Sequence, residues 1–221
     1  MNTLMRPILC YTLTVLFMLW SCTTDSYDKG NGKYSLLQAE LANIHVGADL
    51  RIDYLTTDDD QRLQVANPLA VGWMKTPDTT YRAVAYFNRK EEGAEIIGIN
   101  RVGVAVPKKI DTLKTDPVRF ESLWMGHNGQ YLNASIYLLT GTADDENAIQ
   151  RLGCCKDTLI ANADGSATQR LTLYHDQGGV PEYYSQRTYL SIPMKGIKAD
   201  SVSIAVNTYT GVVRRTLKIE D

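Results

Sequence analysis

The chain has 221 residues and a formal charge of −2, with 44% hydrophobic and 22% charged residues. These proportions are typical of a folded globular protein and exclude a disordered chain. No basic surplus is available to neutralise phosphates, which argues against a nucleic-acid-binding protein.

The N-terminal segment, residues 1–21, has the pattern of a lipoprotein signal peptide. One positive charge, Arg6, precedes an uncharged stretch over residues 7–20. At 1.5 Å per residue this stretch would be roughly 21 Å long, too short for a permanent membrane span. At the end of the segment, Leu-Trp-Ser-Cys (residues 19–22) resembles a bacterial lipobox. We therefore expect cleavage before Cys22 and attachment of lipid, including palmitate, to Cys22. An ordinary signal peptide followed by a chance cysteine is the alternative.

Residues 22–34 are polar, contain two glycines and have no apolar period, which predicts a flexible tether. A lipid on Cys22 would hold the protein to the membrane of the cell envelope, and we expect the outer membrane. Acidic residues just after the cysteine resemble a surface-export signal. Since these are the non-adjacent Asp25 and Asp28, the periplasmic and surface faces both stay open.

An all-β fold is predicted from residue 35 onward, because the apolar residues recur mostly with a period of two. Leu50, Ile52 and Tyr54, for example, alternate with Arg51 and Asp53. Five strands in about 70 residues favour an OB-like barrel over residues 35–110. The predicted barrel strands are residues 36–46, 50–54, 62–65, 81–87 and 95–106.

Residues 111–221 are predicted to form an antiparallel β-sandwich, with the boundary near residues 110–117. Short apolar runs alternate there with turn signals such as His127-Asn-Gly and Asp164-Gly-Ser. The predicted sandwich strands are residues 118–125, 131–139, 149–155, 167–175, 187–193, 202–209 and 212–219.

Several segments together resemble one protein family. Asp116-Pro-Val-Arg-Phe-Glu-Ser-Leu-Trp-Met-Gly, Tyr131-Leu-Asn-Ala-Ser, Ala199-Asp-Ser-Val-Ser-Ile and Asn207-Thr-Tyr-Thr-Gly occur in the order found in the NigD-like lipoproteins of the Bacteroides group. Asn67-Pro-Leu-Ala-Val-Gly-Trp resembles that family's tryptophan-bearing segment. The resemblance implies an N-terminal OB-like domain and a C-terminal β-sandwich. The family is named after a gene near a bacteriocin, for which an immunity role is suggested, and its biochemical activity is not established.

Residues suited to catalysis or metal binding do not form a known motif. Cys154 and Cys155 are adjacent, so in a strand they would face opposite sides, and we expect structural cysteines with one turned inward. A vicinal disulfide is the alternative. His45, His127 and His175 are far apart in the sequence, and no nucleophile elbow or zinc motif accompanies them. We therefore expect no catalytic residue, cofactor or metal.

The acidic run over residues 58–60 lacks the alternating order of a calcium loop, so we expect a solvated hairpin tip.

Two further sets of residues are candidate sites. Tyr183 and Tyr184 follow a proline in a loop and could contact a partner, or they could simply cover a sheet. Thr112, Thr158 and Ser201 follow aspartate and precede an aliphatic residue, which resembles an O-glycosylation motif of exported Bacteroides-group proteins. An aspartate that closes a turn before a strand would create the same triplet.

These observations favour a lipid-anchored, non-enzymatic envelope protein that binds an unidentified protein or glycan. Acidic residues outnumber basic ones in the predicted barrel, which disfavours nucleic acid as the ligand of an OB-like fold. An immunity-type protein that captures a toxin is the alternative. A hydrolase is a third hypothesis, since a site assembled across the domain junction would leave no motif in the sequence.

Overall fold

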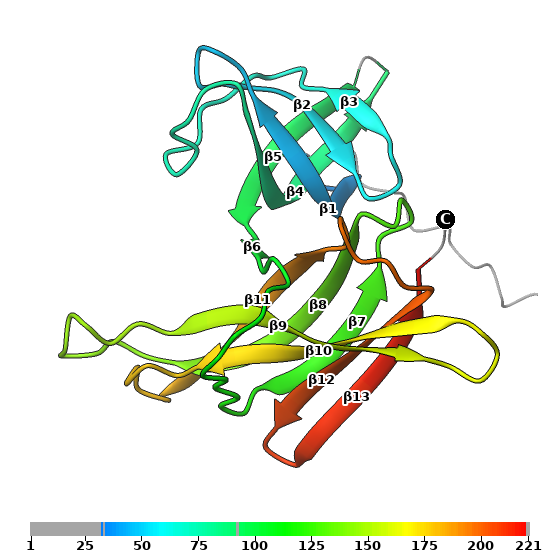
Figure 1. Cartoon of the computed structure of the whole chain (residues 1–221). Coiled ribbons are helices and arrows are strands. Elements are labelled where there is room, and N and C mark those ends of the chain that lie inside the picture. The colour runs from blue at the N-terminus through cyan, green and yellow to red at the C-terminus, as the bar shows by residue number, and fades with distance from the viewer. Residues whose placement is uncertain (1–31, 33, 92, 220–221) are drawn as a thin grey trace, which may run out of the picture. The chain divides into compact units, whose positions relative to one another are not determined.

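The computed structural model describes residue 32, residues 34–91 and residues 93–219. The predicted signal peptide and Cys22 lie outside the described residues, as does most of the predicted tether. All strands belong to the unit that begins at Leu36, and the described residues contain no helix, which confirms the all-β prediction (Figure 1). It follows that no helix within the described residues could span a membrane.

The first sheet closes into an OB-like barrel, as predicted. Its strand order is β3-β2-β1-β4-β5, and the long strand β1 pairs antiparallel with both β2 and β4. A parallel bridge between Val65 and Ala94 joins the two ends of this sheet, and the Ala66 amide donates to the Ala94 carbonyl at 2.9 Å. The strands are β1 (Leu37–Val46), β2 (Ile52–Thr57), β3 (Arg62–Gln64), β4 (Thr79–Lys90) and β5 (Gly93–Arg101).

The alternation predicted for residues 50–54 is wrong in its register. Leu50 lies in a turn with φ of +63° instead of in a strand. Asp53 is an extra residue opposite the step from His45 to Val46, which forms a β-bulge. The bulge leaves Tyr54 only half-buried, whereas Ile52 and Leu55 are fully buried in the barrel core.

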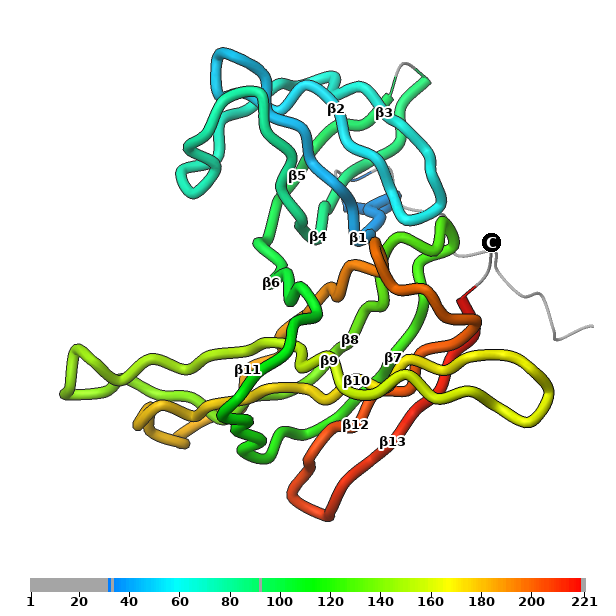
Figure 2. The backbone as a smooth tube through the Cα atoms, in the orientation of Figure 1, coloured from blue at the N-terminus to red at the C-terminus, as the bar shows by residue number. Residues whose placement is uncertain are grey.

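The second half of the strands forms a two-sheet sandwich, as predicted, but one of its sheets includes β6, whose residues were predicted to be in the last barrel strand. One sheet has the order β13-β12-β10-β9 and the other β6-β11-β8-β7. Most pairs are antiparallel, whereas β10–β12 and β6–β11 are parallel. Figure 2 follows the backbone from β5 through the short β6 into the sandwich. The strands are β6 (Gly103–Val104), β7 (Arg119–Met125), β8 (Tyr131–Thr140), β9 (Arg151–Ala161), β10 (Ala167–Asp176), β11 (Tyr184–Pro193), β12 (Ser201–Thr208) and β13 (Gly211–Lys218).

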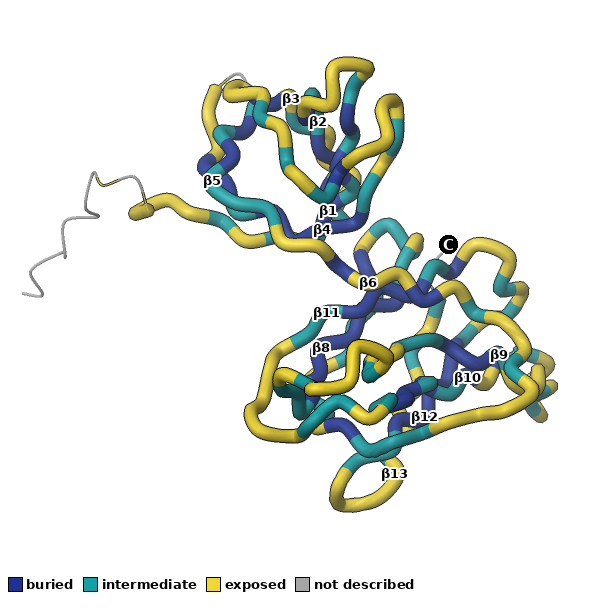
Figure 3. Tube along the Cα trace, turned by 90° about the vertical axis from the view of Figure 1, so that its left-hand side faces the viewer, coloured by how far each residue is buried: buried dark blue, intermediate teal, exposed yellow. Residues whose placement is uncertain are grey.

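The barrel and the sandwich have separate hydrophobic cores. Phe87 is the largest fully buried side chain of the barrel core, and Leu132, Ile136 and Ile204 lie in the sandwich core. Figure 3 shows the buried residues along the strands and exposed residues at the hairpin tips. Each half therefore buries its own apolar face, and polar contacts are left to join them.

The adjacent cysteines are free and both buried, although only one was expected to turn inward. Cys154 belongs to the sandwich core, where burial raises its pKa to about 12. Cys155, on the opposite face of β9, is covered because the segment at Lys108 pairs with it. The Lys156 amide donates to the Lys108 carbonyl at 2.8 Å and holds this segment in place.

Replacing Gly93 with alanine tests the closure of the barrel. Gly93 has φ of +136°, and a Cβ atom there would lie 2.2 Å from the Gln64 carbonyl oxygen. Strain and the clash together should lower the free energy of unfolding by about 2–3 kcal/mol in urea denaturation. Gly165, with φ of +86° and no atom near its missing Cβ, is the matched control. Gly165→Ala should cost roughly 1 kcal/mol from the backbone alone, and equal losses at the two sites would contradict this account.

Candidate functional site

Barrel and sandwich meet at a hydrogen-bonded group of four side chains, here called the junction cluster: Asp58, Arg82, Asn133 and Ser191. Arg82 projects from β4, and its side chain is 1% exposed. Its Nη2 donates to Asp58 Oδ2 at 2.7 Å and to Asn133 Oδ1 at 3.2 Å, while its Nε donates to Ser191 Oγ at 3.0 Å. Asn133 Nδ2 completes the ring by donating to Asp58 Oδ2 at 2.8 Å. One barrel arginine thus binds groups from β8 and β11 of the sandwich.

The acidic run over residues 58–60 forms the turn between β2 and β3, and the prediction of a solvated tip is confirmed for the exposed Asp59 and Asp60 but wrong for Asp58. The Asp58 side chain is only 14% exposed, and its backbone carbonyl accepts from the Asn128 amide at 2.9 Å. Asp59 pairs with His127 at 3.2 Å, and Asp60 accepts from the Asn128 side chain at 3.0 Å. The prediction failed for Asp58 because the turn between β2 and β3 packs on the β7–β8 hairpin, far away in the sequence.

Removing the carboxylate of Asp58 should destabilise the folded protein. Asp58→Ala leaves the buried Arg82 guanidinium without its counter-ion, which should lower the free energy of unfolding by about 3–5 kcal/mol. Urea denaturation measures this loss. Asp144→Ala, at an exposed loop position, should change stability by no more than about 0.5 kcal/mol. Similar values for the two variants would show that the junction cluster does not stabilise the fold.

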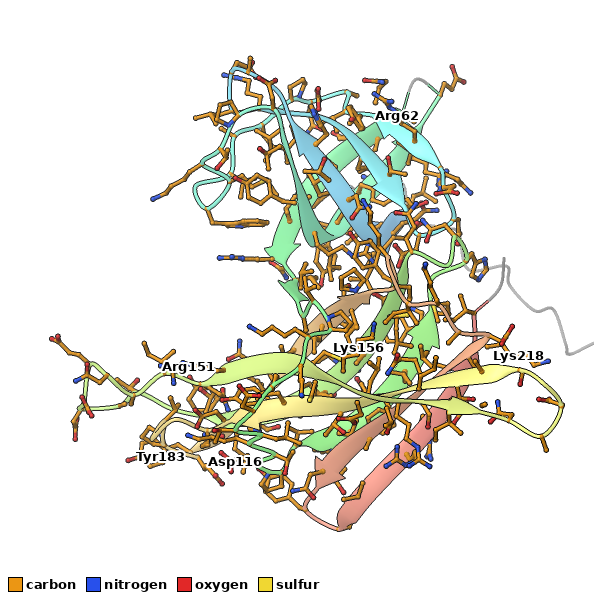
Figure 4. The ribbon with its side chains drawn as sticks, in the orientation of Figure 1. Arg62, Asp116, Arg151, Lys156, Tyr183 and Lys218 are labelled. Atoms are coloured by element: carbon orange, nitrogen blue, oxygen red, sulfur yellow. The ribbon has the colours of Figure 1, made fainter. Side chains whose placement is uncertain are left out.

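A cleft of about 300 Å³ lies beside the junction cluster, and we call it the junction cleft. Its walls come from strands of both halves and from the β2–β3 turn. It differs from the usual ligand face of an OB fold, on β2 and β3, where the Tyr54 ring is stacked on His45 and has Arg62 (labelled in Figure 4) 3.6 Å from its centroid. The cleft is lined by Ala39, Glu40, Leu41, Asp58, Asp59, Val84, Tyr86, Trp124 and Tyr189.

Aromatic rings and carboxylates dominate the lining of the junction cleft. Trp124 and Tyr189 meet edge to face, with ring centroids 6.5 Å apart, and Tyr86 lines the cleft from β4. The carboxylate of Glu40 is 3.6 Å from the Arg89 guanidinium. In register, Trp124 pairs with Asn133, which places the tryptophan beside the junction cluster.

A polar and aromatic face continues from the cleft along β7, β8 and β11; we call it the sheet platform: Arg119, Glu121, Ser135, Tyr137, Arg187 and Tyr189. Glu121 at its centre accepts from both Arg187 and Ser135, which lowers the pKa of Glu121 to about 2. Arg187 lies 5.5 Å from the centroid of Tyr137 and 5.8 Å from that of Tyr189. The charged groups therefore hold the aromatic side chains in position.

The titration of Glu121 checks this arrangement. A carbon-13 NMR titration should give a midpoint of about 2 in the native protein, against an ordinary value of 4.5. Because the folded-state pKa is lowered, the ion pair stabilises the fold above the ordinary pKa, and this contribution is lost as pH falls toward about 2. Arg187→Gln should move the midpoint up toward 4.5. A native midpoint already near 4.5 would mean that the pair does not form in solution.

The three histidines have different surroundings and do not form a common site. His45 pairs with Asp53 at 2.8 Å, and His127 with Asp59. His175 is buried, with Nδ1 2.9 Å from the Asp116 carbonyl oxygen and Nε2 3.0 Å from Gln150 Nε2. Since an amide nitrogen only donates, the Nε2 of His175 accepts, which leaves the proton on Nδ1. Among the described residues, no group of three acidic, histidine or cysteine side chains could hold a metal.

The candidate partner-binding tyrosines are exposed but lie outside the junction cleft. Tyr183 is 78% exposed just before β11 (labelled in Figure 4), and Tyr184 is 57% exposed as the first residue of that strand. Their exposure leaves them available to a partner, so their role stays a prediction.

The candidate glycosylation sites differ in access. Thr112 and Thr158 are exposed, whereas the Ser201 hydroxyl is half-buried and lies 2.8 Å from that of Thr168. The aspartates that precede two of these residues have structural partners. Asp157 accepts from the Thr172 hydroxyl and Asp200 from the Ala167 amide, both at 2.6 Å. The turn explanation therefore accounts for Asp200, which directly precedes β12, whereas Asp157 lies within β9; modification stays a prediction.

Sequence reasoning did not identify the residues that build the cleft as a binding site. Trp124 belongs to a segment that carries the family resemblance, and this was the available signal. Tyr86 and Tyr189 fall in predicted strands, where tyrosine is common, and no local pattern marks Arg82 as a buried ion-pair partner. Their convergence depends on contacts between β4, β7 and β11, which no short-range pattern encodes.

Several solved structures from the Bacteroides group share this fold. A NigD-like immunity protein from Bacteroides caccae is 23% identical, with a TM-score of 0.60 over 80% of this chain and 91% of its own. A candidate toxin-related protein from Parabacteroides distasonis is 17% identical, with a TM-score of 0.59 over 82% and 92%. A candidate lipoprotein from Bacteroides fragilis is 10% identical, with a TM-score of 0.60 over 84% and 98%.

These similarities establish a shared fold over most of the chain. The resemblance to NigD-like lipoproteins is thus confirmed at the level of the fold. No protein-family model and no curated protein sequence matches the chain.

Proposed function

We propose that this protein is a lipid-anchored, non-catalytic binding module of the cell envelope, with the junction cleft as its binding site. The observation that carries the proposal is the cleft itself, where Tyr86, Trp124 and Tyr189 meet beside carboxylates. Aromatic rings combined with a few positioned polar groups are typical of binding sites. The walls lie mostly on strands, so little order has to be gained when a ligand binds.

The partners of the acidic side chains support binding over catalysis. A general acid needs a carboxyl group whose pKa is raised toward neutrality. Asp58 and Glu40 instead pair with arginines, and the pKa of Glu121 is lowered by Arg187. This arrangement suits carboxylates that accept hydrogen bonds from a ligand and disfavours the hydrolase hypothesis.

The location follows from the N-terminal residues. A lipid on Cys22 would place the cleft at the surface of a membrane, in the outer membrane by our proposal. The candidate lipoprotein of Bacteroides fragilis, which shares the fold, supports an anchored form.

An immunity-type role is the second candidate function. It is favoured by the name of the Bacteroides caccae structure, a NigD-like immunity protein. In this role the ligand would be a toxin, and the protein would bind one partner without turnover. The junction cleft would be the binding site in either role. The identity of the captured partner therefore distinguishes an immunity-type protein from another binding module.

Crosslinking in native envelopes, followed by affinity capture and mass spectrometry, tests the proposed function. The wild-type protein should enrich a defined partner, and Cys22→Ala should lose it together with the membrane fraction. Trp124→Ala should reduce the captured amount at least fivefold, because it removes a wall of the cleft.

Tyr183→Ala is the matched control, since it removes an exposed aromatic ring outside the cleft. Loss of the partner in Tyr183→Ala but not in Trp124→Ala would move the binding site to the loop before β11. A partner that all variants bind equally would show that the junction cleft is not the binding site.

A further inference from the structure

We infer that the occupant of the junction cleft is a basic side chain, lysine or arginine, presented by a polypeptide partner. This inference rests on the proposed function and adds the chemical class of the ligand.

The charge of the lining is the first argument. Glu40, Asp58 and Asp59 line the cleft, and none of its described lining residues is a lysine or arginine. The groups that pair with these acids belong to residues outside the lining: Arg89, Arg82 and His127. With His127 neutral, these three carboxylates are balanced by two guanidinium groups, so the wall of the cleft keeps a net negative charge, which is charge complementarity toward a base.

The aromatic rings are the second argument. Elsewhere this chain places its own guanidinium groups over tyrosine rings: Arg82 lies 4.2 Å from the Tyr131 centroid and Arg119 4.8 Å from the Tyr137 centroid. Within the described part of the chain, no guanidinium lies over Trp124 or Tyr86 in this way. Tryptophan is the strongest cation–π acceptor, so the cleft offers this contact to an external cation.

The size of the cleft favours a side chain over a larger ligand. Its volume of about 300 Å³ is at the lower end of small-molecule sites. A sugar ring would also stack on Trp124, but a neutral sugar gains less than a cation from a wall that keeps a net negative charge. The charge of the wall therefore decides in favour of the basic side chain.

Peptide binding monitored by tryptophan fluorescence tests the inference. The reporter is the full chain in detergent with Trp20→Phe and Trp73→Phe, so that Trp124 is the remaining tryptophan. The probes are end-blocked Gly-Gly-Arg-Gly-Gly, its lysine analogue and its citrulline analogue, which keeps the shape of arginine without the charge. The charged peptides should change the emission saturably and bind at least tenfold more tightly than the citrulline peptide, with affinity falling as salt is raised.

Two variants locate the effect. Asp59→Asn removes one lining charge without touching Arg82 and should weaken binding of the arginine peptide by roughly 3- to 10-fold. Asp144→Asn removes an exposed charge outside the cleft and should leave binding within a factor of about 1.5.

Equal binding of the arginine and citrulline peptides, or no binding of either, would overturn the inference. A saturable response to glucose or mannose hexasaccharides in place of the charged peptides would also overturn it, yet would leave the cleft as a binding site. The proposed function fails separately, if Trp124→Ala captures the same partner as the wild-type protein from native envelopes.

Discussion

A buried arginine is the constraint on which the arrangement of this molecule depends. The guanidinium of Arg82 is withdrawn from water, and a buried charge without partners costs several kcal/mol. Its partners, Asp58, Asn133 and Ser191, stand 24, 51 and 109 positions away in the chain. They can meet Arg82 only if the β2–β3 turn, β8 and β11 converge. The two hydrophobic cores have no residue in common, so this polar contact helps to specify how their surfaces meet.

The junction cleft is a consequence of the same contact. Trp124 and Tyr189 are neighbours of Asn133 and Ser191 in the sandwich sheet, and Tyr86 lies on β4, the strand that carries Arg82. The residues that line the cleft are thus placed by strands that the junction cluster holds together. Binding sites built on strands keep their geometry better than sites built on loops. The platform with Glu121 and Arg187 extends this ordered surface beyond the cleft.

The fold class and the approximate positions of the strands could be predicted from the sequence, because strands with one buried face show a period of two. The register at residues 50–54 could not, since the β-bulge at Asp53 depends on pairing with β1. Burial of Cys155 was missed because the covering segment at Lys108 has no apolar pattern.

The junction cleft itself could not be predicted from the sequence. Two of its acids, Asp58 and Asp59, belong to a predicted solvated turn, and the partners of Asp58, Arg82 and Asn133, stand 24 and 75 positions away. Local patterns report the face of a strand, but they do not report which distant strand lies against it.

The central claim is that the junction cluster joins barrel and sandwich into one cooperative structure. Trp73 packs on the barrel core and Trp124 lies in β7 of the sandwich, so single-tryptophan proteins with Trp20 replaced report on each half separately. Urea unfolding followed by fluorescence should give the same midpoint and the same slope for both reporters, as a two-state transition requires. Two separate transitions, with one half unfolding while the other stays native, would contradict the account.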